Sequence, residues 1–227
     1  MRPPARARCA AAALRLAAAA FALLPALTAA PAAGGTLVVH VQTPDGQLLA
    51  GAVVMARPLD APARKPAPVR VVMDQLNRTF APDLLVIPVG STVEFPNSDS
   101  VSHQIYSFSP AKRFQLPLYR GKPYPPVRFD QPGLVTLGCN IHDEMLAHLL
   151  VTDAPYFGRT DAAGAWSAEL PRGRYRVTLW HPRLREAESD LERELTIGDA
   201  DRAELALQLS RPLQPAPLHD RPHSRDY

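Results

Sequence analysis

The chain has 227 residues, including 25 prolines and 2 cysteines, and a formal net charge of +3. So many prolines disfavour long helices and favour strands and turns, and two cysteines are too few for a disulfide-built scaffold. The length suits one large domain or two small ones, with enough core to fold without disulfides.

The N-terminal segment has the pattern of a secretory signal peptide. A short basic stretch precedes a mostly apolar run, and small residues near 30–33 offer a cleavage site. The apolar run between Arg15 and Pro25 has about nine residues, against the roughly 20 that span a bilayer. We therefore predict a signal peptide over 1–32, a periplasmic protein, and no transmembrane segment after its removal.

Removal of this segment changes both the charge and the cysteine count. Four arginines leave with it and no acidic residue does, so 21 Lys and Arg face 22 Asp and Glu, which gives no reason to expect nucleic-acid binding. Cys9 leaves too, so Cys139 becomes a single thiol that cannot form an internal disulfide. A free thiol in an oxidising compartment is open to oxidation, and a bound metal would protect it.

The remaining chain reads as strands and turns. Residues 34–58 alternate apolar and polar positions around a Pro-Asp-Gly turn, and 59–68 is a proline-rich linker. Eight short apolar runs fill 69–153, which suits a small β-sandwich or barrel. Further strands are expected within 154–210, and the polar, proline-rich 211–227 is expected to be a disordered tail.

One of the later strands shows clear alternation. Tyr175, Val177 and Leu179 are apolar and alternate with Arg174, Arg176 and Thr178, which predicts one buried and one solvent-facing side. Nearby, Trp180 and His181 are interpreted as packing and turn residues, and His148 as a surface residue.

A possible metal site lies in the stretch GCNIHDEM. Cys139, His142 and Met145 follow one another with the spacing Cys-x2-His-x2-Met, in and just after a turn between two apolar runs. His103 lies 36 residues before Cys139, at the start of the run SHQIYSF. Two histidines and a cysteine with a weak axial methionine form the ligand set of blue copper sites. These four residues are therefore the candidate metal ligands.

Two other roles for these residues have to be weighed. Zinc would accept the cysteine and the two histidines, but it seldom uses methionine. Nucleophilic catalysis by Cys139 with His142 as base is less favoured, because no glycine-rich oxyanion turn and no third orienting residue accompany the pair. The soft thiolate and thioether favour one copper ion as the cofactor.

The sequence also resembles a known family. VGSTVEFPNSDSVSHQIYSFS, followed by FDQPGLVTLGCNIHDEMLAHLLV, resembles the cupredoxins, and the short ligand loop is similar to that of amicyanin. The closer resemblance is to the periplasmic methylamine-utilisation-protein-like group, through FPN, YSFS, GCNIHD and WHP, over about 69–184. The resemblance implies that His103, Cys139 and His142 are equatorial copper ligands and Met145 the axial one.

The flanking segments resemble a different family. GQLLAGAVV and TDAAGAWSAELPRGRYRVTLWHP are similar to carboxypeptidase-regulatory-like, prealbumin-type β-sandwiches. The predicted fold is therefore all-β, with a cupredoxin Greek-key sandwich at 69–153 inserted in, or packed beside, a second sandwich. That second sandwich would be formed by 34–58 and 154–210.

Two positions depart from what cupredoxins usually carry. An asparagine commonly follows the upstream histidine and steadies the ligand loops, whereas this chain has Gln104, so Asn97 or Asn140 could take that role. Asp143 and Glu144 stand where amicyanin-like loops are apolar. Either they make the site locally acidic and favour a basic redox partner, or they only point into solvent.

The predicted function is that of a periplasmic type 1 copper protein, either a one-electron carrier or the copper-bearing module of a larger redox system, and not an enzyme. A copper store without electron transfer is an alternative. A third possibility is a binding module that grips a protein partner or a glycan, with copper as a structural metal.

Overall fold

The computed structural model describes residues 34–62, 64–121, 123–198 and 202–216, all within one compact unit. The predicted signal peptide and the tail beyond 216 lie outside these residues. The described residues form strands and one short 3-10 turn, Glu188–Leu191, so the all-β prediction is confirmed. No helix among the described residues has the length and apolar character to cross a membrane.

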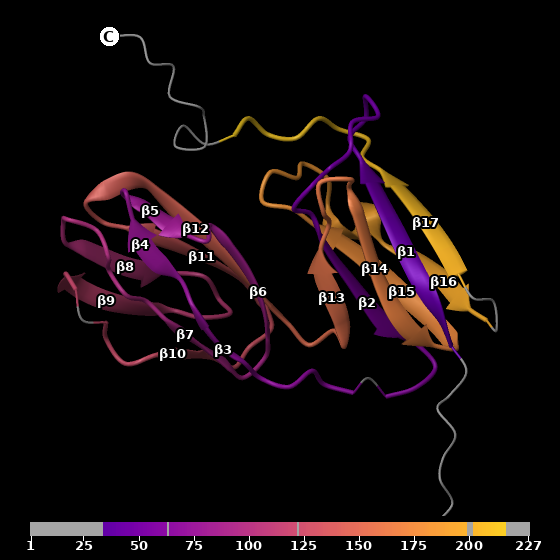
Figure 1. The fold of residues 1–227 in the computed structure, drawn as a ribbon, viewed down its shortest axis with the longest axis horizontal. Coiled ribbons are helices and arrows are strands. Elements are labelled where there is room, and N and C mark those ends of the chain that lie inside the picture. Colours follow the sequence, from indigo (N-terminus) through magenta and orange to yellow (C-terminus); the bar gives the residue numbers. More distant parts are fainter. Residues whose placement is uncertain (1–33, 63, 122, 199–201, 217–227) are drawn as a thin grey trace, which may run out of the picture. The chain divides into compact units, whose positions relative to one another are not determined.

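Two sheets are built from strands near both ends of the chain (Figure 1). One has the order β14-β1-β17, with β1 antiparallel to β14 and parallel to β17, and the other has the order β13-β2-β15-β16. The strand bounds are β1 Gly34–Gln42, β2 Val53–Pro58, β13 Tyr156–Arg159, β14 Ala165–Pro171, β15 Gly173–Trp180, β16 Arg193–Ile197 and β17 Arg202–Gln208.

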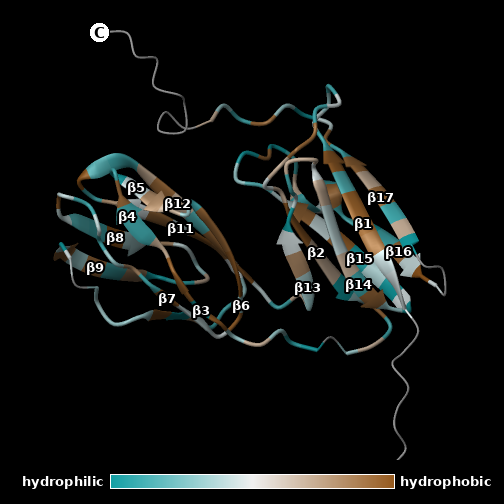
Figure 2. Cartoon of the chain, in the orientation of Figure 1, coloured by the Kyte–Doolittle hydropathy of each residue, from teal (hydrophilic) through white to brown (hydrophobic). Residues whose placement is uncertain are grey.

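The alternation predicted for β15 is confirmed on its buried side. Tyr175, Val177 and Leu179 belong to one hydrophobic core with residues of β1, β2 and β17. On the other side the prediction holds for Arg174, which is exposed, but Thr178 is buried. Figure 2 shows the apolar residues concentrated along the strands and the hydrophilic ones in the connecting loops. Burial of this apolar side is what holds the strands together.

The middle of the chain forms a five-stranded sheet of order β6-β12-β11-β8-β9, a three-stranded sheet of order β10-β7-β3 and the hairpin β4-β5. The bounds are β3 Arg70–Val72, β4 Asp74–Leu76, β5 Thr79–Ala81, β6 Leu84–Pro88, β7 Ser91–Glu94, β8 His103–Ser107, β9 Phe114–Tyr119, β10 Val127–Phe129, β11 Gly133–Cys139 and β12 His142–Thr152. A second core lies among these strands, and it includes both Cys139 and Met145.

Candidate metal centre

Strands β11 and β12 form a tight hairpin that carries three of the four candidate ligands. Cys139 ends β11, a two-residue turn follows, and His142 opens β12, so β12 starts earlier than the sequence indicated. Gly138 pairs with Leu146 while Cys139 pairs with His142, so residues 143–145 form a bulge on β12. A bulge redirects side chains locally, which allows His142 and Met145 to leave the regular alternation of the strand.

The first residue of β8 completes the group. His103 is fully buried, and its Nδ1 lies 3.8 Å from the Sγ of Cys139. The Nδ1 of His142 lies 3.8 Å from the same sulfur, and the two imidazole centroids are 4.9 Å apart. The donor atoms of the three residues all lie within 4.8 Å of one another. The structure therefore brings together three of the four predicted ligands from two separate segments.

The spacing of these donors suits one ion bound between them. Nitrogen and sulfur ligands at about 2.0 to 2.3 Å from a common ion are about 3.8 Å apart when their directions differ by about 120°, and closer in a tetrahedral arrangement. The two observed separations of 3.8 Å match the wider, trigonal arrangement. Two imidazoles and a thiolate in a plane are the equatorial ligands of a blue copper site. The residues present thus fit copper.

Met145 lies three residues after His142 on β12, and only 1% of its surface is exposed. It belongs to the same hydrophobic core as Cys139. This position below the turn is compatible with a weak axial contact, but it is equally suited to packing. Its role as the axial ligand stays a prediction.

Asp99, a carboxylate that is not among the candidate ligands, fixes the orientation of His103. The Nε2 of His103 donates a hydrogen bond to Oδ2 of Asp99, at 3.0 Å. Asp99 also accepts hydrogen bonds from the backbone N–H groups of Arg78 and Ser100, both at 2.7 Å. The N–H of Arg78, and then the bond from His103, lower the pKa of Asp99 to about 2. A proton on Nε2 leaves Nδ1 of His103 free to bind a metal.

Asn97 holds the turn that presents Asp99. Its side chain donates to the carbonyls of Val101 and Tyr119 and accepts a hydrogen bond from the backbone N–H of Asp99. Of the two asparagines considered from the sequence, Asn97 is buried and bonded in this way, whereas Asn140 is exposed in the hairpin turn. Asn97 therefore steadies the segment before His103.

The β4-β5 hairpin approaches the same centre. Its turn residues Asn77 and Arg78 both have positive φ, 53° and 58°, as two-residue hairpin turns require. Arg78 provides the N–H that Asp99 accepts, and its charge also acts on His142. The pKa of His142 is lowered, first by desolvation and then by the charges of His103 and Arg78. A cation thus lies near the outer histidine.

The site has one buried side and one accessible side. His103 and Cys139 are almost fully buried, whereas His142 is partly exposed at the end of the hairpin. Asp143 and Glu144, which follow His142, are exposed. Of the three donor residues, His142 is therefore the most accessible from solvent.

Comparisons with known proteins give a partial likeness. No protein-family model matches the chain, and no curated protein does. Similar solved structures include a novel purple cupredoxin from Nitrosopumilus maritimus, 25% identical over 36% of this chain and 99% of that chain, with a TM-score of 0.33. A copper-containing nitrite reductase from Thermus scotoductus is 29% identical over 42% of this chain and 25% of that chain, with a TM-score of 0.34.

A reduced amicyanin variant is also similar, with 20% identity over 36% of this chain and 80% of that chain, and a TM-score of 0.33. TM-scores this low carry no weight in assigning a function, so the assignment rests on the residues of the site. The resemblances of the chain to the methylamine-utilisation-protein-like group and of its flanks to prealbumin-type sandwiches stay predictions.

Proposed function

We propose that this protein binds one copper ion through His103, Cys139 and His142, with Met145 as a weak axial ligand, and carries single electrons. The observation that carries the proposal is the convergence of two imidazole nitrogens on one thiol sulfur, each at 3.8 Å. When bound there, copper would supply a one-electron redox couple.

The residues of this chain provide the conditions that such a couple needs. His103 is fixed by Asp99, and Cys139 is held at a strand end inside a packed core, so little rearrangement is needed between oxidation states. His142 is the accessible contact for electron exchange. Because Cys139 is only 2% exposed, its sulfur is poorly placed to attack a substrate, which favours a carrier over an enzyme.

The proposal extends to location and domain organisation. An exported chain with a single thiol fits the periplasm, where that thiol would be occupied by the metal. We also propose that the strands flanking the copper region form a prealbumin-like sandwich with the copper region inserted, since β1 and β2 pair with β14, β15 and β17 from the far side of the insertion.

The test is to add Cu(II) to the purified protein and record the visible spectrum. A trigonal site with a thiolate ligand should give an intense band from sulfur-to-copper charge transfer at one equivalent of copper. Cys139→Ser should abolish the band, and Asn140→Ser, in the exposed turn beside it, is the matched control that should keep it. A colourless protein that prefers zinc would contradict the proposal.

A further inference from the structure

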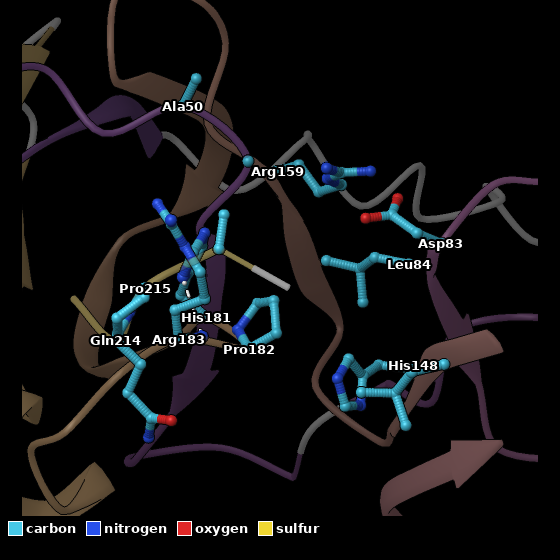
Figure 3. A pocket seen from close by; sticks show the side chains of 13 residues that line it. Ala50, Asp83, Leu84, His148, Arg159, His181, Pro182, Arg183, Gln214 and Pro215 are labelled. Atoms are coloured by element: carbon cyan, nitrogen blue, oxygen red, sulfur yellow. Dashed lines mark hydrogen bonds between the residues drawn. The ribbon is translucent and has the colours of Figure 1, made fainter. Parts of the chain in front are cut away.

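A cavity of about 420 Å³ lies apart from the three metal-binding candidates (Figure 3). Its lining comes from distant parts of the sequence, including Arg159 at the end of β13, the segment after β15 and the start of β6. A volume in this range suits a small organic molecule. The cavity contains none of His103, Cys139, His142 or Met145.

Two guanidinium groups line this cavity without an acidic partner. Among the described residues, neither Arg159 nor Arg183 forms an ion pair or a side-chain hydrogen bond, although Asp83 also lines the cavity. The charges of Arg183, Arg159 and Asp83 all act on the ring of His181. Two cations and one carboxylate leave an excess of positive charge.

Gly51 helps to define where Arg159 lies. Gly51 has a φ of +78°, and a Cβ at this position would come within 3.0 Å of Nη2 of Arg159. The guanidinium therefore rests close to the backbone at Gly51, where a side chain would displace it. This position belongs to the built wall of the cavity, because Gly51 lines it as well.

His181 adds a neutral donor. Its Nδ1 accepts a hydrogen bond from the backbone N–H of Arg183, at 3.2 Å, so the ring proton is on Nε2. Burial, and then the charges of Arg183 and Arg159, lower the pKa of His181 to about 4. The ring is therefore neutral at neutral pH and offers an N–H group, in addition to the turn role expected from the sequence, which its bonds to Arg183 and Leu184 bear out.

The rest of the lining is mixed. Leu84, Leu146 and Pro182 supply apolar surface. His148, interpreted from the sequence as a surface residue, is half-buried, lines the cavity and packs edge-on against Trp180 with ring centroids 5.8 Å apart. Asp83 would repel a second negative group on a ligand. These features favour a ligand with one anionic end and an apolar body.

We propose that this cavity binds a small organic anion whose carboxylate or phosphate head contacts Arg159 and Arg183. Guanidinium groups bind both heads through charge-assisted, often bidentate hydrogen bonds. The apolar body of the ligand lies against Leu84, Leu146 and Pro182. The proposal does not depend on the metal, since no candidate ligand lines the cavity.

The experiment is a calorimetric titration of the full chain with four probes. Benzoate and benzamide have nearly the same shape but differ in charge. Phenyl phosphate tests whether a phosphate head is accepted in place of a carboxylate, and inorganic phosphate, which lacks the ring, tests the contribution of the apolar body. Benzoate or phenyl phosphate should bind, and benzamide at least tenfold more weakly. The tighter of the two anions identifies the head, whereas equal binding of benzoate and benzamide would overturn the proposal.

Variants decide whether the cavity is responsible. Arg183→Gln and Arg159→Gln should each weaken binding of the tighter anion at least tenfold. Arg185 is exposed, lies two residues after Arg183 and does not line the cavity. Arg185→Gln therefore removes the same charge outside the site and should change the affinity for the anion less than twofold. Equal effects of Arg183→Gln and Arg185→Gln would show that the anion is attracted only by the net charge of the protein, and would contradict the proposal that it binds in the cavity.

Two further measurements guard against misfolding. Thermal unfolding of each variant shows whether it folds. If the Gln variants do not fold, Arg183→Lys replaces them as the test. This variant keeps the charge but loses the planar fork, so it should bind the tighter anion more weakly than the unmodified protein does. The visible spectrum with added copper should be unchanged by Arg183→Gln, so failure of anion binding and failure of copper binding are separate results.

Discussion

The candidate metal centre and the arginine-lined cavity are built in opposite ways. At the candidate metal centre the donor atoms lie within 4.8 Å of one another, and the outer nitrogen of His103 is bonded to Asp99. In the cavity, two guanidinium groups have no acidic partner among the described residues and line a volume of about 420 Å³. Close convergence of soft donors indicates a single ion, and unpaired cations around a larger space indicate a molecule.

The two histidines of the candidate metal centre also differ from each other, in burial and in hydrogen bonding. His103 is fully buried and hydrogen-bonded, whereas His142 is partly exposed. The buried ring is therefore expected to contribute more to folding than the outer ring, which is the more accessible from solvent. The predictions below, from the largest expected effect to the smallest, test these differences.

The first prediction separates the two histidines. His103→Ala should lower the free energy of unfolding of the metal-free protein by about 2 to 4 kcal/mol, because it leaves a cavity and removes the partner of Asp99. His142→Ala should cost less than about 1 kcal/mol. Urea unfolding of both variants measures this, and equal losses would contradict the assignment of an inner and an outer histidine. Both should lose the copper band.

The second prediction concerns pH and the cavity. The pKa of His181 is lowered to about 4 from its usual 6.5, so the unfolded chain binds a proton more readily between these values. The contribution of the neutral His181 ring to the free energy of unfolding is therefore fully present above about pH 6.5 and is lost as the pH falls towards 4. The unfolding free energy of the protein relative to His181→Gln should fall by about 1 to 2 kcal/mol over that range, after allowance for partial exposure. A flat difference would contradict the burial of this ring.

The third prediction tests the carboxylate behind His103. Asp99→Asn keeps an acceptor for Nε2 but removes a negative charge near the bound copper, which disfavours the more positive oxidised ion. The reduction potential should rise by on the order of 50 mV. The exposed Asp190→Asn is the control and should change the potential by much less. An unchanged potential in Asp99→Asn would mean that this carboxylate only positions the ring.

The fourth prediction concerns the exposed acids beside His142. If Asp143 and Glu144 attract a basic redox partner, the rate of electron transfer with that partner should fall as ionic strength rises. Asp143→Asn combined with Glu144→Gln should weaken that dependence and slow the reaction a few-fold at low salt. Arg78, whose charge acts on His142, should oppose this effect, so Arg78→Gln should strengthen the dependence. If the double variant keeps the salt dependence of the unmodified protein, Asp143 and Glu144 do not attract the redox partner.

Much of the fold class and of the metal centre could be predicted from the sequence because the signals were local. Proline content and alternating apolar residues indicate strands, and the Cys-x2-His-x2-Met spacing places three groups at one turn. The early start of β12 at His142 was missed because the turn has only two residues, which apolarity alone does not reveal.

The features that the sequence could not provide depend on pairing between distant segments. Nothing local indicates that β1 lies parallel to β17, or that Arg159, Arg183 and His181 share a cavity with Asp83. Asp99 offered a weak signal, an acid four residues before a candidate ligand, but a turn rich in Asp and Ser is common without any such role. These sites arise from topology rather than from motif.

Voltammetry of the copper-loaded protein tests the central claim most directly. A site already held in place by Asp99 and by a packed core should give a reversible one-electron wave at one copper per chain, with little separation between the oxidation and reduction peaks. That result is predicted for an electron carrier. A protein that binds copper but shows no reversible wave, or releases the ion on reduction, would contradict the account and favour a copper store.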